Sequence, residues 1–174
     1  MSEQDGLFAT EPKYALDSNV VLSFLKTEDD EHYGVDVFAA QWQFLERHMK
    51  EGKIIAPRQI EKELDAWADH SDTIKAWLRD HRYLFCDVDD AQLALAKKII
   101  NAYPAYGLSS NSLGDLELMT LAGARSLTVL SLEHKRSTQP NRRLPKIPDV
   151  CAEYEIDCVS FPGFLRREGF GSAS

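Results

Sequence analysis

The strongest constraint on the fold is an alternation of short apolar runs with longer amphipathic segments. Five runs have the length and content of buried strands, at 13–16, 54–56, 83–87, 127–131 and 157–160. Between them, apolar residues recur with helical spacing at 36–51, 58–69, 71–81, 90–103, 112–124, 148–155 and 161–168. Strands that alternate with helices favour a parallel sheet covered on both faces. We therefore predict an α/β fold, a three-layer α/β/α sandwich with a central, mainly parallel sheet.

The chain length indicates one domain. Its 174 residues, 44% of them hydrophobic, suffice for one sizeable core. We expect a loose leader at 1–12, the domain at 13–168 and a loose tail at 169–174. No apolar run approaches the length of a membrane span, and the polar, acidic start does not resemble a signal peptide.

Charge and cysteine content narrow the class of protein. A net charge of -8 excludes the basic excess that marks a DNA-wrapping protein. It does not exclude a nucleic-acid enzyme, because clustered carboxylates can hold metal ions that face the phosphates. Three cysteines without a CxxC spacing argue against a disulfide framework or a structural zinc site. We expect a reduced, cytosolic protein.

Carboxylates are expected at one edge of the sheet. Asp17 directly follows the first strand, and Glu133 closes the fourth. Both emerge at the same edge if these parallel strands are neighbours. Glu63 and Asp115 lie near the starts of helices that could face that edge. Such carboxylates repel one another unless a cation offsets their charge, and hard oxygen ligands suit Mg²⁺ or Mn²⁺.

Each acid taken alone also has a structural explanation. Asp17 could cap a helix, and Asp115 could favour a helix dipole. Glu63 could be a solvated position among the charges around it, and Glu133 could begin a polar loop. Four separate explanations of this kind account less well for the pattern than one shared cation.

Four short stretches occur in an order and spacing that carry a family resemblance: ALDSNVV, IEKEL, GDLELMTLA and LTVLSLE. Together they resemble the PIN domain, especially the PIN-like toxins related to the VapC ribonucleases. The ending KIPDVCAEYEIDCVSFPGFLRREG is similar to one uncharacterised branch of these toxins. The resemblance covers about residues 13–168. It implies a metal-dependent endoribonuclease that uses Mg²⁺ or Mn²⁺ and metal-activated water to cut RNA, leaving a 5′-phosphate.

The resemblance also assigns residues. The catalytic and metal-binding acids would be Asp17, Glu63, Asp115 and Glu133. The family usually has Asp at the last position, so the glutamate there departs from its pattern. Asn19 matches the Asn of the opening and is expected to orient Asp17 or a loop amide. Ser131 stands where Thr is common and is expected to help hold the scissile phosphate or a metal-bound water.

The segment 133–148 is a long loop without apolar periodicity, and such loops are often functional. Its basic residues include Lys135, Arg136, Arg142 and Arg143. Two interpretations stay open, a solubilising surface loop and a set of cations that grip RNA phosphates. For Tyr103 and Tyr106 in the stretch NAYPAYG, packing in the core or at a hinge is favoured over base stacking.

Two other functions are alternatives to the ribonuclease. A haloacid-dehalogenase-type phosphatase would need a second Asp two residues after Asp17, where this chain has Asn19. A PIN-like binding module without catalysis stays open.

The toxin resemblance implies RNA as substrate and a cognate antitoxin as partner, and it allows a homodimer. An apolar face with Trp42, Leu45 and Met49, or the segment with Trp67 and Trp77, could receive that partner, although core packing is favoured for most of them.

Overall fold

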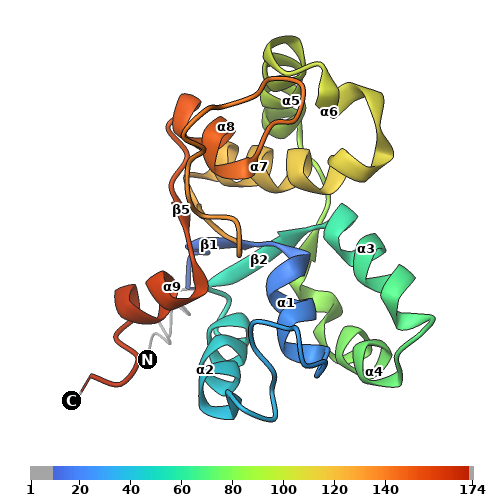
Figure 1. Cartoon of the computed structure of the whole chain (residues 1–174), viewed down its shortest axis with the longest axis vertical. Coiled ribbons are helices and arrows are strands. Elements are labelled where there is room, and N and C mark those ends of the chain that lie inside the picture. Colours follow the sequence, from blue (N-terminus) through green and yellow to red (C-terminus); the bar gives the residue numbers. More distant parts are fainter. Residues whose placement is uncertain (1–9, 173–174) are drawn as a thin grey trace, which may run out of the picture.

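Short parallel strands form the centre of the computed structural model, which describes residues 10–172 (Figure 1). The strands are β1 (Tyr14–Leu16), β2 (Ile54–Pro57), β3 (Phe85–Cys86), β4 (Thr128–Leu130) and β5 (Cys158–Val159). Their order is β3-β2-β1-β4-β5, and every neighbouring pair in this sheet is parallel. Each lies within or overlaps a run that the sequence predicted as a strand.

Helices cover both faces of the sheet (Figure 1). Those described are α1 (Ser18–Leu25), α2 (Ala39–Lys50), α3 (Arg58–Ala68), α4 (Asp72–His81), α5 (Asp90–Ala102), α6 (Ala105–Leu108), α7 (Leu113–Arg125), α8 (Ile147–Glu153) and α9 (Phe161–Arg167), with the 3-10 turns η1 (Arg82–Leu84) and η2 (Ser110–Ser112). The predicted three-layer α/β/α sandwich is confirmed.

The alternation of side chains along β1 divides the core into two halves. Tyr14 and Leu16 join the half formed with α1, α2, α3, α4 and α9. Ala15 points to the opposite face and joins the half formed with α5, α6, α7 and α8. Trp42, Trp77 and the tyrosines at 103 and 106 are buried in these halves, so the favoured core interpretation holds for them.

The central position of β1 brings distant chain segments together. Ala15 is in register with Ile55 of β2 and with Val129 of β4. The Asp17 amide donates a hydrogen bond of 3.0 Å to the Leu130 carbonyl, which joins the ends of β1 and β4. The condition that these strands are neighbours is therefore met.

Some boundaries differ from the prediction. α2 begins at Ala39 rather than at residue 36, because residues 35–37 form a turn held by hydrogen bonds to Gly34 and Phe24. The sequence also did not predict α6 and η2, which are too short to show a periodicity. Within the described residues, no helix has both the length and the apolar character of a membrane span.

The chain ends are described in part. Most of the expected leader, residues 1–9, and the end of the expected tail, 173–174, lie outside the described residues. The Phe170 ring stands 5.2 Å from the Phe44 ring, centroid to centroid, so the chain still contacts the domain after residue 168.

Candidate active site

Asp17 lies at the carboxyl end of β1, directly before α1. Its side chain makes no hydrogen bond of capping geometry to α1, although the nearby Asn19 backbone amide acts to lower its pKa. The Ser131 hydroxyl donates to its Oδ2 atom at 2.8 Å. The side chain is 4% exposed. Burial raises the pKa of Asp17 to about 6, while the Ser131 hydrogen bond opposes that rise and the charge of Glu63 adds to it.

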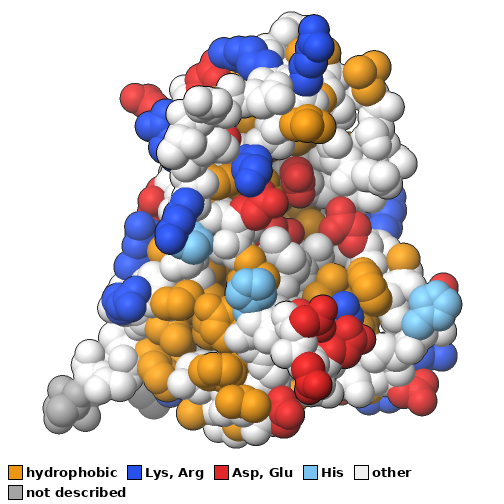
Figure 2. Space-filling model, viewed as in Figure 1, with side chains coloured by type: hydrophobic (Ala, Val, Ile, Leu, Met, Phe, Trp, Pro, Cys, Tyr) orange, Lys and Arg blue, Asp and Glu red, His pale blue; other side chains and the backbone are white. Residues whose placement is uncertain are grey.

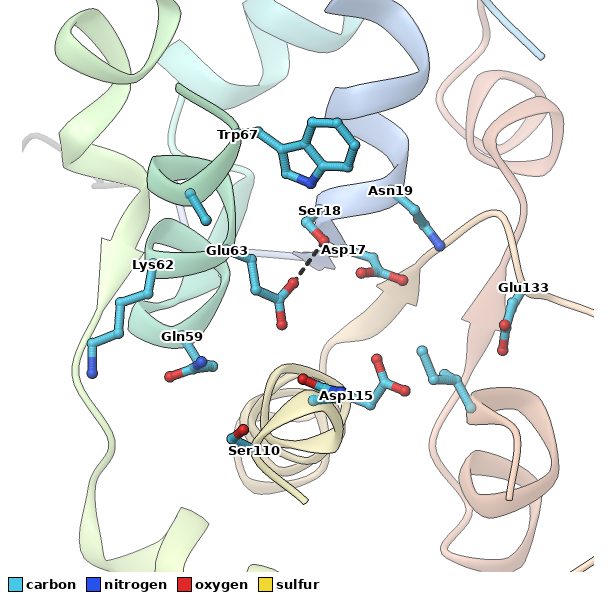
Figure 3. A pocket seen from close by; sticks show the side chains of 13 residues that line it. Asp17, Ser18, Asn19, Gln59, Lys62, Glu63, Trp67, Ser110, Asp115 and Glu133 are labelled. Carbon is cyan, nitrogen blue, oxygen red and sulfur yellow. Dashed lines mark hydrogen bonds between the residues drawn. The ribbon is translucent and has the colours of Figure 1, made fainter. Parts of the chain in front are cut away.

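Glu63 reaches the same place from the second turn of α3. The Ser18 hydroxyl donates to its Oε2 atom at 2.8 Å, and Ser18 is the residue after Asp17 (Figure 3). Burial raises the pKa of Glu63, although the Ser18 hydrogen bond acts against the rise. The explanation of Glu63 as a solvated position therefore fails, because its carboxylate is half-buried and held in place.

Asp115 lies in the first turn of α7 and is half-buried. Burial raises its pKa to about 7, and the charges of Asp17, Glu133 and Glu63 add to the rise in that order. Within residues 10–172, no Lys or Arg forms an ion pair with any of these carboxylates. The repulsion between them is therefore not offset by the protein.

Glu133 is exposed in the loop that follows β4. Its backbone amide donates to the Ser131 hydroxyl oxygen at 3.1 Å, so Ser131 connects the loop to Asp17. Figure 3 shows the Glu133 carboxylate on the opposite side of the site from Glu63, with Asp17 between them.

One cavity of about 590 Å³ contains all four carboxylates. It is lined by Asp17, Ser18, Asn19, Gln59, Lys62, Glu63, Ala66, Trp67, Ser110, Asn111, Asp115, Glu133 and Ile147. Figure 2 shows acidic side chains gathered where the surface is hollowed. In Figure 3 the Lys62 side chain extends away from the acids.

The donor set fits a divalent cation of the Mg²⁺ type. It consists of carboxylate oxygens, the hard ligands that such cations prefer. Among the described residues, no three of these four acids have carboxylate oxygens that all lie within 4.8 Å of one another. The acids Glu28, Asp30 and Glu31 do reach that spacing. The Glu28 cluster differs, because Lys26 already pairs with Glu31 at 3.0 Å and with Glu28 at 3.9 Å.

The supporting residues have defined contacts. The Asn19 Oδ1 atom accepts a hydrogen bond of 3.4 Å from the Leu132 amide, which agrees with its expected contact to a loop amide. Ser131 is 0% exposed and donates to Asp17, which indicates a role in positioning that carboxylate. Its expected role at the scissile phosphate or a metal-bound water stays a prediction.

Two neighbouring acids, Glu61 and Glu117, make other contacts. The Glu61 carboxylate accepts hydrogen bonds from Arg58 and Arg82. The Glu117 Oε2 atom accepts a hydrogen bond of 3.1 Å from the backbone amide of Gln59, in the first turn of α3. Neither residue lines the acidic cavity.

A family model described as "Domain of unknown function (DUF4411)" matches residues 14–171. The chain belongs to the DUF4411 family. No curated protein matches it.

Solved structures resemble this DUF4411 protein in fold. VapBC2 from Rickettsia felis, bound to a DNA fragment from its promoter, has a TM-score of 0.51 and 14% identity, over 84% of this chain and 97% of that one. FitAcB from Neisseria gonorrhoeae has a TM-score of 0.54 and 13% identity, over 85% and 97%. Identities this low establish the fold alone, which is PIN-like.

The basic loop of this DUF4411 protein contacts the acidic cavity less than expected. None of Lys135, Arg136, Arg142 and Arg143 lines it. The Arg142 guanidinium lies 4.5 Å from the Tyr103 ring centroid and donates to the Ala102 carbonyl at 3.1 Å and to Glu153 at 3.2 Å. These contacts tie Arg142 to α5 and α8, and RNA binding by the basic loop stays a prediction.

Sequence reasoning missed two features of the site. A Cβ atom at Gly114 would overlap the Glu63 carboxylate, so glycine leaves that carboxylate its present place beside α7. The sequence did hold a sign of this close contact, because a glycine stands directly before Asp115. Trp67 was considered only as part of a partner surface, yet its position four residues after Glu63 places both on one helix face.

Proposed function

We propose that this DUF4411 protein is a Mg²⁺- or Mn²⁺-dependent endoribonuclease, the toxin of a toxin–antitoxin pair, acting in the cytoplasm. One observation carries the proposal. Four carboxylates from distant parts of the chain line a single cavity, and no ion pair within residues 10–172 neutralises them. The PIN-like fold supports it.

The acids Asp17, Glu63, Asp115 and Glu133 would hold the cation. When bound, a divalent cation lowers the pKa of water and stabilises charge on a phosphodiester. Ser131 and Ser18 each bond one oxygen of a carboxylate, Oδ2 of Asp17 and Oε2 of Glu63. Each hydrogen bond fixes the carboxylate, and the Asn19 backbone amide also lowers the pKa of Asp17.

No histidine lines the cavity as an alternative base. His134 follows Glu133, but its Nδ1 atom lies 3.0 Å from the Leu132 carbonyl and its side chain is not part of the lining. The phosphatase alternative is not supported, because the Asn19 side chain faces the Leu132 amide and has no acidic proton to give.

The decisive experiment is cleavage of total RNA by the purified full-length protein. We expect cleavage with Mn²⁺, none with EDTA, and none by Asp17→Asn or Glu63→Gln. Asp65→Asn is the matched control, since it changes an exposed acid on α3 outside the cavity. Full activity of Asp17→Asn would contradict the assignment. A folded, inactive wild type that still binds Mn²⁺ would support the PIN-like binding module instead.

A nuclease of this kind in the cytoplasm needs restraint, so we propose a cognate antitoxin as partner and a homodimer as the assembly. The VapBC2 structure, bound to a promoter fragment, supports an assembly of this type. We expect the protein to co-purify with the product of an adjacent gene. Good expression of the active protein alone, without growth arrest, would contradict this proposal.

A further inference from the structure

Trp67 is an exposed indole at the rim of an acidic cavity. It lies on α3 one turn after Glu63, and both side chains line the cavity (Figure 3). Its residue exposure is 43%, whereas Trp42 and Trp77 are 6% and 7% exposed. An indole left in water beside carboxylates gives up hydrophobic stabilisation, which core packing would have supplied.

The indole is also held in a defined place. The Lys26 ammonium lies 4.4 Å from the ring centroid, and it forms an ion pair of 3.0 Å with Glu31. A cation over an aromatic ring attracts the ring through its quadrupole. The contact restrains the ring from one side, and the rest of the indole faces the cavity and solvent.

Uncharged amides lie in the same cavity. Gln59 on α3 and Asn111 on η2 both line it, and their side-chain amides have no hydrogen-bond partner among residues 10–172. An amide group offers a donor and an acceptor together, which is the combination that the edges of nucleobases match. Figure 3 shows Gln59 and Trp67 on the Glu63 side of the site, across from Glu133.

We propose that this side of the cavity is a nucleobase subsite. The Trp67 indole stacks on one base of single-stranded RNA. Gln59 and Asn111, which lie beyond Glu63 near the start of α3, bind the edge of a neighbouring base. The proposal deepens the ribonuclease function, since it rests on a phosphate of the same strand lying at the acids. Stacking on an aromatic side chain tolerates any base, and amides that bond a base edge add preference among bases.

Fluorescence tests the stacking directly in the full-length protein. The probe is a short oligouridylate in Ca²⁺, with gel analysis to verify that it stays intact. Because the other tryptophans are buried, quenching on titration reports on Trp67. We expect quenching by the oligouridylate and little by an abasic strand of the same length. Equal quenching by the abasic strand would overturn the subsite.

Substitutions separate stacking from a general apolar role. We expect Trp67→Leu to weaken binding of labelled oligouridylate about ten-fold, and Trp67→Phe to retain most of the affinity. The matched control is Tyr83→Leu, an exposed aromatic residue that does not line the cavity. Unchanged RNA affinity of Trp67→Leu would overturn the proposal, and loss of antitoxin binding alone would assign the indole to a protein partner.

The test is independent of catalysis. Base-dependent quenching without any cleavage in Mn²⁺ would keep the subsite and remove the nuclease function. Cleavage with an unchanged KM in Trp67→Leu would keep the nuclease function and remove the subsite. Cleavage with a raised KM and a nearly unchanged kcat in that variant would support both.

Discussion

The Ser131 hydroxyl donates a 2.8 Å hydrogen bond to the Asp17 carboxylate, and both side chains are buried where neighbouring strands end. The same hydroxyl accepts from the Glu133 amide at 3.1 Å. One serine therefore connects two candidate metal ligands that lie far apart in the sequence. It holds a buried charge that burial alone would disfavour.

We expect Ser131→Ala to weaken Mn²⁺ binding by roughly ten- to hundred-fold, the range for partners that orient a metal ligand. Without the hydroxyl, Asp17 loses its orientation, and the pKa of its carboxyl rises further above about 6. Titration calorimetry measures the affinity. Ser131→Thr keeps the hydroxyl and should bind nearly as the wild type does. Equal affinities for the alanine and threonine variants would contradict this role.

The raised carboxyl pKa values predict an unusual dependence of stability on pH without metal. Burial raises the pKa of Asp115 from 3.8 to about 7, so the folded state binds more protons than the unfolded state between these values. The contribution of Asp115 to the free energy of unfolding therefore falls as pH rises through this window. With Mn²⁺ the sign reverses, because the cation binds the ionised form.

Urea unfolding in EDTA at two pH values measures this contribution. At pH ~7.5 we expect Asp115→Asn to be more stable than the wild type by about 1–2 kcal/mol, discounted for the partial exposure of the group. The difference should shrink at pH ~5.5 and change sign in Mn²⁺. Asp69→Asn, an exposed acid outside the cavity, is the control. A wild type more stable than Asp115→Asn in EDTA at both pH values would contradict the repulsion.

Features that depend on residues close together in the sequence could be predicted from it. The apolar run before Asp17 marked a strand end, and the order of the four motifs singled out Glu63. Contacts between segments far apart in the chain left no such pattern. Neither the approach of Gly114 to Glu63 nor the anchoring of Arg142 on Tyr103 follows from periodicity or composition. The helical spacing of Trp67 from Glu63 already placed both residues on one helix face. Only the cavity shows that this face belongs to the site.

The anchoring of Arg142 predicts different results for two adjacent arginines. Arg142 bonds Glu153 and covers the Tyr103 ring, whereas the Arg143 side chain has no ion pair within the described residues. We expect Arg142→Ala to lower the melting temperature slightly and to leave the salt dependence of RNA binding unchanged. In a double variant with both Arg142→Ala and Arg143→Ala, any loss of salt dependence in RNA binding should come from Arg143. A slope reduced by Arg142→Ala alone would show that this side chain also contacts RNA.

Gly114→Ala is expected to disrupt the site without removing a functional group. The added methyl group would overlap the Glu63 carboxylate, so α7 must shift or Glu63 must leave its contact with Ser18. The clash is with the end of a flexible side chain at a cavity, so we expect a cost below about 1 kcal/mol of unfolding free energy, partly offset by the better helix propensity of alanine. We expect Mn²⁺ affinity and RNA cleavage to fall in this variant. Removing the clashing carboxylate gives the control, because Gly114→Ala should cost little further stability in a Glu63→Ala background. Equal costs in both backgrounds, measured by urea unfolding, would show that the glycine does not make room for the Glu63 carboxylate.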